Sequence, residues 1–253
     1  MSSRSSSKVR CLILLALIIM IIMNHCYASI IDPSRVKSIS WKPRAFMYEG
    51  FLSQVECQHL ISKAKPNLTR STVTDLATGV SRLSAHRTSH GMFIPRNNDP
   101  IVGGIEEKIS AWTFLPKENG EAIQVLRYEG GEGYEAHFDF FQDKFHIQAK
   151  SGNRIATVLM YLNDVIQGGE TLFPLAQDYP LHNGASKTSY NHSTECAKRG
   201  LAVKPRRGDA IVFFGIHVNG SVDGRSLHEA CPVIKGQKWS AVKWIHMYPI
   251  HGI

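Results

Sequence analysis

A histidine and an aspartate one position apart, His137 and Asp139, could bind a single divalent metal ion. On a β-strand successive side chains point to opposite faces, so these two would share one face. A third ligand is available from His228, far along the chain. Two imidazoles and one carboxylate form the facial arrangement that binds Fe(II) and leaves positions open for a co-substrate and O2. The pattern therefore indicates a non-haem iron centre that activates oxygen.

The His-x-Asp pair is weak support when it is taken alone. With 12 histidines and 9 aspartates among 253 residues, chance gives about 0.4 such pairs. The flanking sequence is more specific, because residues 121–128 have the composition of a strand and lead to the pair through a glycine-rich turn at 130–133. Residues 207–214 then form a turn and a strand ahead of His228. The spacing and order thus favour a metal site at the mouth of a β-structure.

Hydrophobic periodicity predicts the elements that position these residues. Residues 51–65 carry apolar side chains at helical spacing and end before a proline, and residues 99–112 form a second helix with Pro100 in its first turn. The pattern then changes to short β-branched and aromatic segments, which predict strands at 122–128, 154–162, 201–204, 209–214 and 238–248. We expect a mainly β fold, a double-stranded β-helix or jelly roll, with helices buttressing one side.

Composition limits the classes of protein to consider. A chain of 253 residues with 43% hydrophobic content can bury one sizeable core, and no linker divides it. Its net charge is +8, of which three positive charges precede an apolar N-terminal run. No basic stripe is interleaved with aromatic residues, so a nucleic-acid partner is not expected. We predict one catalytic domain at residues 32–253.

The N-terminal segment, residues 1–31, has the pattern of a targeting sequence. A basic stretch precedes thirteen apolar residues, Cys11 to Met23, and Cys26-Tyr27-Ala28 offers a small-residue cleavage site. Thirteen residues are few for a membrane span, which normally takes about 20. These features favour a cleaved signal peptide, and a retained signal anchor is the alternative. Both place the domain in the secretory lumen, where disulfides and glycans form.

Four sequence blocks occur in one order after this segment. They are residues 124–139 with the sequence QVLRYEGGEGYEAHFD, residues 156–163 with ATVLMYLN, residues 168–174 with GGETLFP, and residues 228–239 with HEACPVIKGQKW. In these blocks the chain resembles the prolyl 4-hydroxylases, and most of all the plant type that modifies cell-wall glycoproteins. The resemblance extends from about residue 39 to residue 248. It implies a peptidyl-proline 4-dioxygenase that uses Fe(II), O2 and 2-oxoglutarate, with L-ascorbate as a reductant.

The resemblance also implies roles for residues around the metal. Lys238, ten positions after His228, would pair with the distal carboxylate of 2-oxoglutarate, and the hydroxyls of Tyr128 and Thr171 would help to hold the same molecule. In the family an extended proline-rich chain binds over the iron, which suits a polyproline II helix. Four residues match family positions around the target proline, namely Tyr134, Arg154, Trp244 and His246. Residues 81–90 resemble the loop that closes over the peptide.

Two modifications are expected in the secretory lumen. The resemblance implies a disulfide between Cys196 and Cys231, close to the third metal ligand, and the alternative is a buried free thiol at Cys231. Three Asn-x-Ser/Thr triplets begin at Asn67, Asn191 and Asn219, and such triplets are common by chance. Asn191 lies in a polar stretch and is the predicted glycan acceptor. Similar plant enzymes are commonly retained in the membrane as single-pass proteins, so we expect residence in the endoplasmic reticulum or Golgi.

Some positions depart from the family pattern. Phe138 and Phe140 stand where many relatives have tyrosines, and Glu229 follows the third ligand where glycine is more usual. The loop at 81–90 carries Arg82 and His86, which makes it more basic than in relatives. None of these positions is a predicted ligand, but the loop leaves the peptide preference open.

The sequence therefore predicts hydroxylation of C4 of proline in proline-rich secretory or cell-wall proteins, with succinate and CO2 as the other products. A 2-oxoglutarate oxygenase that acts on another peptidyl side chain, such as lysine, shares the same iron site and is the nearest alternative. A non-catalytic β-domain that binds peptide or sugar is a more distant one. Such a binder has no use for a cation that pairs with 2-oxoglutarate.

Overall fold

The computed structural model describes residues 31–74, 80–95, 99–177 and 194–250. The chain divides into two compact units, Met1–Pro33 and Ser34–Ile253, and the elements below belong to the second. The predicted targeting segment lies almost wholly outside the described residues and stays a prediction. No helix within the described ranges is both long and apolar enough to span a membrane.

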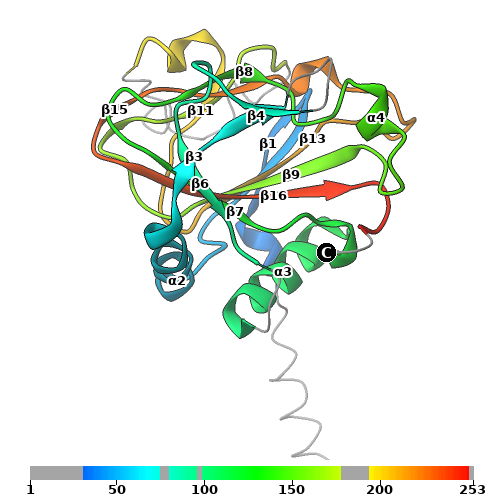
Figure 1. The fold of residues 1–253 in the computed structure, drawn as a ribbon, viewed down its shortest axis with the longest axis horizontal. Helices are drawn as coiled ribbons and strands as arrows, with labels where there is room; N and C mark the ends of the chain where they lie inside the picture. The colour runs from blue at the N-terminus through cyan, green and yellow to red at the C-terminus, as the bar shows by residue number, and fades with distance from the viewer. Residues whose placement is uncertain (1–30, 75–79, 96–98, 178–193, 251–253) are drawn as a thin grey trace, which may run out of the picture. The chain divides into compact units, whose positions relative to one another are not determined.

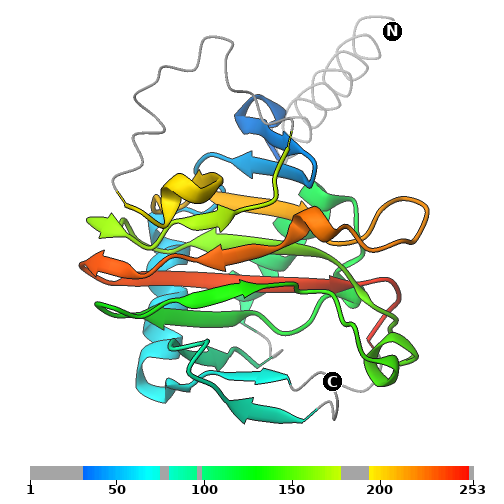
Figure 2. The same ribbon diagram turned by 90° about the horizontal axis from the view of Figure 1, so that it is seen from above.

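A large antiparallel sheet forms the middle layer of the second unit (Figure 1). Its strands lie in the order β1 (Val36–Trp41), β2 (Arg44–Tyr48), β13 (Ala210–Phe214), β9 (Arg154–Tyr161), β16 (Lys238–His246), β7 (Gln124–Tyr128), β6 (His90–Phe93) and β3 (Thr69–Arg70). The long strand β16, red in Figure 2, runs through the middle of this unit between β9 and β7.

A smaller antiparallel sheet packs on one face of the large sheet. Its strands lie in the order β12 (Leu201–Val203), β11 (Thr171–Phe173), β14 (His228–Ala230) and β8 (Tyr134–His137). Two short pairs flank it, β10 (Gln167–Gly168) with β15 (Val233–Lys235) and β4 (Thr72–Thr74) with β5 (Ser81–Leu83). The predicted jelly-roll class with buttressing helices is confirmed.

The helices cover the opposite face of the large sheet (Figure 1). They are α2 (Gln54–Ala64) and α3 (Pro100–Thr113), and a single turn, α4 (Lys144–Ile147), follows β8. The first predicted helix started too early, because Ser53 caps α2 and forms a reciprocal capping box with Glu56. Asp99 caps α3 by accepting hydrogen bonds from two backbone N–H groups.

Strand β16 is buried along its whole length because both of its faces are covered. Alternation along a strand sends Lys238, Val242 and Trp244 toward the smaller sheet, where all three line one pocket. Lys243 points the other way and pairs with Glu106 of α3. One strand thus joins the core under the helices to the space between the two sheets.

The space between the sheets is filled with apolar side chains at one end. Phe173 and Leu201 of the smaller sheet pack against Tyr161 and Phe213 of the large sheet in a single buried cluster. Close packing of large side chains makes this end rigid. A second apolar cluster, which includes Tyr128, Val242 and Trp244, lies beside the pocket that the predicted metal ligands line.

Candidate metal centre and active site

The two predicted histidine ligands are cross-strand partners in the smaller sheet. His137 ends β8 and His228 begins β14, and the two residues pair directly. Their Nε2 atoms lie 3.6 Å and 3.4 Å from the two carboxylate oxygens of Asp139. The three potential ligand atoms all lie within 4.8 Å of one another. We call His137, Asp139 and His228 the metal triad.

Both imidazoles of the metal triad are held in one tautomer by the backbone. The Nδ1–H of His137 donates to the carbonyl of Glu135 at 2.8 Å, and that of His228 donates to the carbonyl of Ser226 at 3.1 Å. A carbonyl can only accept, so Nδ1 carries the proton in each ring. Each Nε2 therefore presents a lone pair toward Asp139. Fixing the ligating nitrogen through the other nitrogen is the usual arrangement in metal sites.

Electrostatics in the triad favours a neutral imidazole beside a carboxylate. Burial, together with the nearby His228, lowers the pKa of His137 to about 3. Burial alone would raise the pKa of Asp139, but the two histidines and a hydrogen bond from Thr157 bring that pKa below its ordinary value. Neutral imidazoles and an ionised carboxylate are the forms that bind a metal.

One local expectation was wrong. Asp139 does not lie on the same strand as His137, because β8 ends at His137 and Asp139 follows in a bend. Its side chain nevertheless lies beside the two histidines. Two contacts from the large sheet hold it there: Thr157 donates to its carboxylate at 2.7 Å, and Arg154 donates to its carbonyl at 3.4 Å.

Next to the metal triad, a narrow pocket runs between the two sheets. Lys238, Tyr128 and Thr171, the three predicted co-substrate residues, all line it together with the triad. Lys238 Nζ lies 5.4 Å and 5.8 Å from the ring centres of Tyr128 and Tyr161. The hydroxyl of Tyr161 donates to that of Thr171 at 2.8 Å, so the hydrogen of the Thr171 hydroxyl is free to bind an anion.

Lys238 is a buried lysine at the inner end of the pocket, and only 1% of it is exposed. Burial lowers its pKa to about 7, although the nearby Glu170 acts in the opposite direction. A buried ammonium gains from an anionic ligand that enters the pocket. The pocket thus extends from the metal triad to Lys238 and suits a small dicarboxylate.

A wider groove opens on the other side of the triad and shares its walls with the pocket. The groove has a volume of about 480 Å³, and the pocket has a volume of about 40 Å³. Tyr134, Arg154 and Trp244 line the groove as the sequence predicted, and phenylalanines 93, 138, 140 and 141 add apolar surface. Its aromatic walls suit an extended chain.

His246, the fourth predicted peptide residue, lies behind the groove wall. Its ring contacts Glu121 at 2.8 Å and the carbonyl of Gly152 at 3.0 Å. Glu121 also binds the guanidinium of Arg154 through both carboxylate oxygens. Arg154 itself lies over the rings of Trp244 and Phe141, at 4.2 Å and 4.6 Å from their centres. His246 therefore reaches the groove through Glu121 and Arg154. Its role at the peptide stays a prediction.

Three residues of the site were missed by sequence reasoning. Arg87 lies over the ring of Tyr134 at 4.9 Å and binds the side chain of Gln124 at 2.9 Å, and Glu121 and Thr157 make the contacts described above. Tyr134 in turn stacks on His137, with ring centres 3.5 Å apart. Arg87 lies in a loop, Glu121 precedes a strand and Thr157 lies within one. No spacing in the sequence marks residues of these types as part of a site. Only the position of Arg87 in the loop 81–90 pointed toward the groove.

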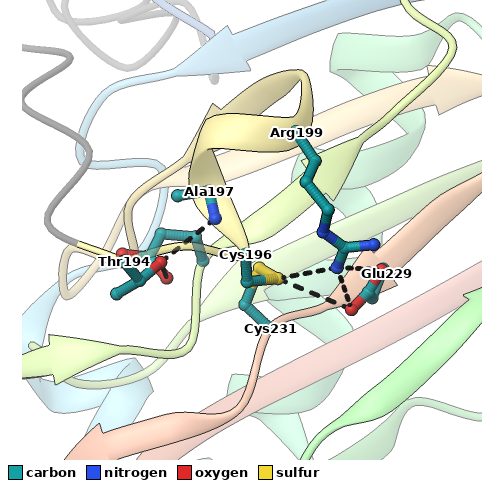
Figure 3. The surroundings of a disulfide bond; sticks show 7 residues. Thr194, Cys196, Ala197, Arg199, Glu229 and Cys231 are labelled. Carbon is teal, nitrogen blue, oxygen red and sulfur yellow. Dashed lines mark hydrogen bonds and ion pairs between the residues drawn. A yellow bond between two sulfur atoms is a disulfide. The ribbon is translucent and has the colours of Figure 1, made fainter.

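A disulfide between Cys196 and Cys231 braces the strand of the third ligand (Figure 3). Beside it, Arg199 binds both carboxylate oxygens of Glu229, at 2.6 Å and 2.7 Å, and contacts the sulfur of Cys196 at 3.2 Å. Glu229 is the departure from the family pattern noted above. It faces away from the metal triad and ties β14 to the segment that contains Cys196. Asn191, the predicted glycan acceptor, lies outside the described residues.

The donor set of the triad fits iron. Two imidazole nitrogens and one carboxylate oxygen lie within 4.8 Å of one another, and residues of the triad line both the pocket and the groove. A structural zinc site would be closed by four protein ligands. The second group of potential ligands found among the described residues, Cys196, Glu229 and Cys231, has its sulfurs in the disulfide and its carboxylate on Arg199.

Comparison with known proteins identifies close relatives. Residues 123–246 match the family model of the 2OG-Fe(II) oxygenase superfamily. Over 220 residues the chain is 56% identical to prolyl 4-hydroxylase 2 of Arabidopsis thaliana, covering 87% of this chain and 73% of the relative. Probable prolyl 4-hydroxylase 4 of the same plant is 57% identical, covering 86% and 72%.

Among solved structures, a viral collagen prolyl hydroxylase from Paramecium bursaria Chlorella virus-1, in its 2OG complex, is similar to this chain. The TM-score is 0.58 at 25% identity, and the match covers 80% of this chain and 95% of the viral chain. A prolyl hydroxylase of Trichoplax adhaerens, in complex with a peptide fragment of hypoxia inducible factor, shares the fold at 16% identity and a TM-score of 0.52.

Proposed function

The chain belongs to the prolyl 4-hydroxylases of the 2OG-Fe(II) oxygenase superfamily, and from this premise we propose that it hydroxylates C4 of proline in proline-rich secretory polypeptides. It is an oxidoreductase that depends on Fe(II) and 2-oxoglutarate. The observation that carries the proposal is the buried Lys238 at the inner end of a pocket that has the metal triad at its mouth.

The residues divide the work between metal, co-substrate and peptide. The metal triad would hold Fe(II), with both histidines oriented by backbone carbonyls. Lys238 would pair with the distal carboxylate of 2-oxoglutarate, and Thr171 and Tyr128 would add hydroxyl donors. When bound, the iron supplies the oxygen chemistry that couples decarboxylation of 2-oxoglutarate to hydroxylation of the proline. The protein supplies orientation and excludes water from the space between the sheets.

The groove would bind the substrate as a polyproline II helix. Such a helix is already extended, so it loses little conformational entropy on docking against aromatic walls. Tyr134 and Trp244 offer those walls, and Arg154 is fixed between two rings by Glu121. Contacts with Glu121 and Asp139 use three of its five N–H donors, and the remaining two could donate to peptide carbonyls.

The site of action we propose is the lumen of the endoplasmic reticulum or Golgi, with ascorbate as reductant and residues 1–31 as signal peptide or anchor. The disulfide supports an oxidising compartment. For glycosylation, Asn191 stays the first choice. Asn219 is a second acceptor because it is exposed in a turn, where its side chain accepts from the hydroxyl of Ser221 at 2.7 Å.

The experiment that tests the activity begins under anaerobic conditions. Purified protein is loaded with Fe(II) and 2-oxoglutarate, a proline-repeat peptide is added, and O2 is admitted. We expect one succinate per hydroxyl group, and fragmentation by mass spectrometry should place the oxygen on C4 of proline. A Gly/Ser peptide of equal length is the control for the groove, and Lys238→Ala is the control for the pocket.

The outcomes separate the competing functions. Oxidation of lysine in a mixed peptide panel, with proline unchanged, would show a different target for the same iron site. Metal binding without any succinate would show a binding domain instead of an enzyme. Protease protection in microsomes, measured on the same chain, tests the lumenal location independently of activity.

A further inference from the structure

Strand β9 places one hydroxyl against the metal triad. Thr157 lies in an otherwise apolar run, residues 155–160, and only 3% of it is exposed. Its neighbours across the sheet are Phe213 on one side and Trp244 on the other. A buried hydroxyl with no acceptor lowers the stability of the fold by about 1–3 kcal/mol, so the acceptor of this hydroxyl matters to the structure of the site. That partner is Asp139, at 2.7 Å from the hydroxyl to Oδ2.

Asp139 has particular need of such a contact. It is the one member of the metal triad outside a strand, so no ladder of backbone hydrogen bonds fixes it. Each histidine of the triad is oriented by a carbonyl two residues away, whereas the aspartate is oriented from the opposite sheet. Without the hydroxyl, the carboxylate would be free to rotate about its terminal bond.

The hydrogen bond also decides how the two carboxylate oxygens are used. Oδ2 accepts the hydrogen bond from the Thr157 hydroxyl and lies 3.4 Å from Nε2 of His228, while Oδ1 lies 3.6 Å from Nε2 of His137. A carboxylate bound from one side by a hydroxyl keeps its plane fixed, and this limits the ways in which it can meet a metal.

We propose that Thr157 is the positioning residue for the metal-binding carboxylate. It sets the plane of the Asp139 carboxylate before the metal enters, and it acts on the carboxylate itself, whereas Arg154 of the same strand contacts the backbone carbonyl of Asp139. The proposal deepens the proposed function because it concerns the same iron site. It is nevertheless tested by metal binding alone, with no turnover required.

The test compares Thr157→Val, which keeps the shape and removes the hydroxyl, with Thr157→Ser, which keeps the hydroxyl. Co(II) is titrated anaerobically into metal-free protein and the dissociation constant is read from its absorbance. Removing a partner of a metal ligand typically costs about 10- to 100-fold in metal affinity. We expect such a loss in Thr157→Val and recovery to within about threefold of wild type in Thr157→Ser.

Two controls distinguish positioning from a general loss of stability. Thr113→Val removes a hydroxyl that binds the carbonyl of Ile109 in α3, away from the pocket, and should leave the Co(II) affinity unchanged. The 2-oxoglutarate affinity, measured at saturating Co(II), should change little in Thr157→Val because Lys238 is intact.

Equal Co(II) affinity in wild type and Thr157→Val would overturn the proposal, even if the melting temperature fell. A loss of affinity that Thr157→Ser does not recover would also overturn it, because the shape of the side chain and not its hydroxyl would then matter. If Thr157→Val binds Co(II) weakly while the wild type hydroxylates no proline, the positioning role stands and the proposed function fails. The two conclusions can therefore be judged separately.

Discussion

Binding of 2-oxoglutarate should consume a proton, because Lys238 changes its charge state when the co-substrate enters. In the empty pocket burial holds the pKa of this lysine at about 7. A dicarboxylate beside it would return the pKa toward the ordinary value of about 10.4. Above pH 7 the empty protein holds a neutral amine and the complex an ammonium. The affinity for 2-oxoglutarate must then fall as pH rises through that value.

The size of this effect follows from the fraction of protein with a neutral lysine. With a pKa of about 7, the neutral fraction of Lys238 raises the dissociation constant of 2-oxoglutarate about 1.3-fold at pH 6.5 and about 33-fold at pH 8.5, relative to fully protonated Lys238. The dissociation constant should therefore rise about 25-fold between these two pH values. Both carboxylates of 2-oxoglutarate stay ionised over this range, since free carboxyl groups titrate near pH 4. The measurement is anaerobic calorimetry on Co(II)-loaded protein in two buffers of different ionisation enthalpy, which also counts the protons taken up.

Lys238→Ala is the control that assigns the effect. It removes a charge-assisted partner worth about 1.5–3 kcal/mol, or about 10- to 150-fold in affinity, and should bind 2-oxoglutarate with little dependence on pH. The ratio of mutant to wild-type dissociation constants should therefore be largest near pH 6.5 and shrink toward pH 8.5. Lys238→Arg should recover little, because a guanidinium is larger and forked. A flat wild-type profile, or an equal slope in Lys238→Ala, would refute the reasoning.

Three further predictions follow from the contacts of the site and of the helices. Alanine at any member of the metal triad should abolish succinate formation and leave the circular dichroism spectrum of the fold intact; near-normal turnover at saturating Fe(II) would show that the residue is not a ligand. Tyr134→Ala and Trp244→Ala should raise the peptide requirement and spare the decarboxylation of 2-oxoglutarate seen without peptide, and an equal loss of both rates would place these residues outside the groove. The pKa of Asp99 lies far below its ordinary value, because hydrogen bonds from Lys63, the α3 backbone and His59 overcome the opposing effect of burial. Ionised Asp99 therefore stabilises the folded protein above about pH 4, and this contribution is lost as the pH falls. Asp99→Asn should keep the helix cap but flatten the fall of melting temperature between about pH 5 and pH 2; an unchanged acid profile would contradict the assignment.

The resemblance to the family predicted the parts of the site that depend on motif spacing. His228 and Lys238 lie ten positions apart, and the structure places one at the mouth and the other at the inner end of a single pocket. The strand that carries Lys238 was predicted to within two residues, because continuous burial on both faces gives it a largely apolar sequence, interrupted by two lysines, Ser240 and His246. Chain spacing could not show that β8 ends before Asp139, because a strand ends where its partner stops pairing.

Contacts between the sheets were also beyond prediction from the sequence. Thr157 and Asp139 are ordinary residue types in unrelated segments, and their hydrogen bond exists only because two sheets face each other. Arg154 shows a related limit. Alternation along the strand would send Arg154 and Thr157 to opposite faces of the sheet. The pairing of β9 with β16 shifts register near Ile245, however, and the two side chains reach the same end of the sandwich.

The two sheets contribute different parts of the chemistry, and this explains where the fold is braced. The smaller sheet carries both imidazoles on short strands, and the large sheet carries Lys238 on a long buried one. Short strands hold their residues less firmly, so the strand of His228 needs support from outside the sheet. It receives the disulfide of Cys231 and the ion pair of Glu229 with Arg199 within three residues of the ligand. The hydroxyl of Thr157 then ties the remaining ligand to the large sheet. The distance between the metal triad and Lys238 is thus set by packing between the two sheets, which tolerates little change.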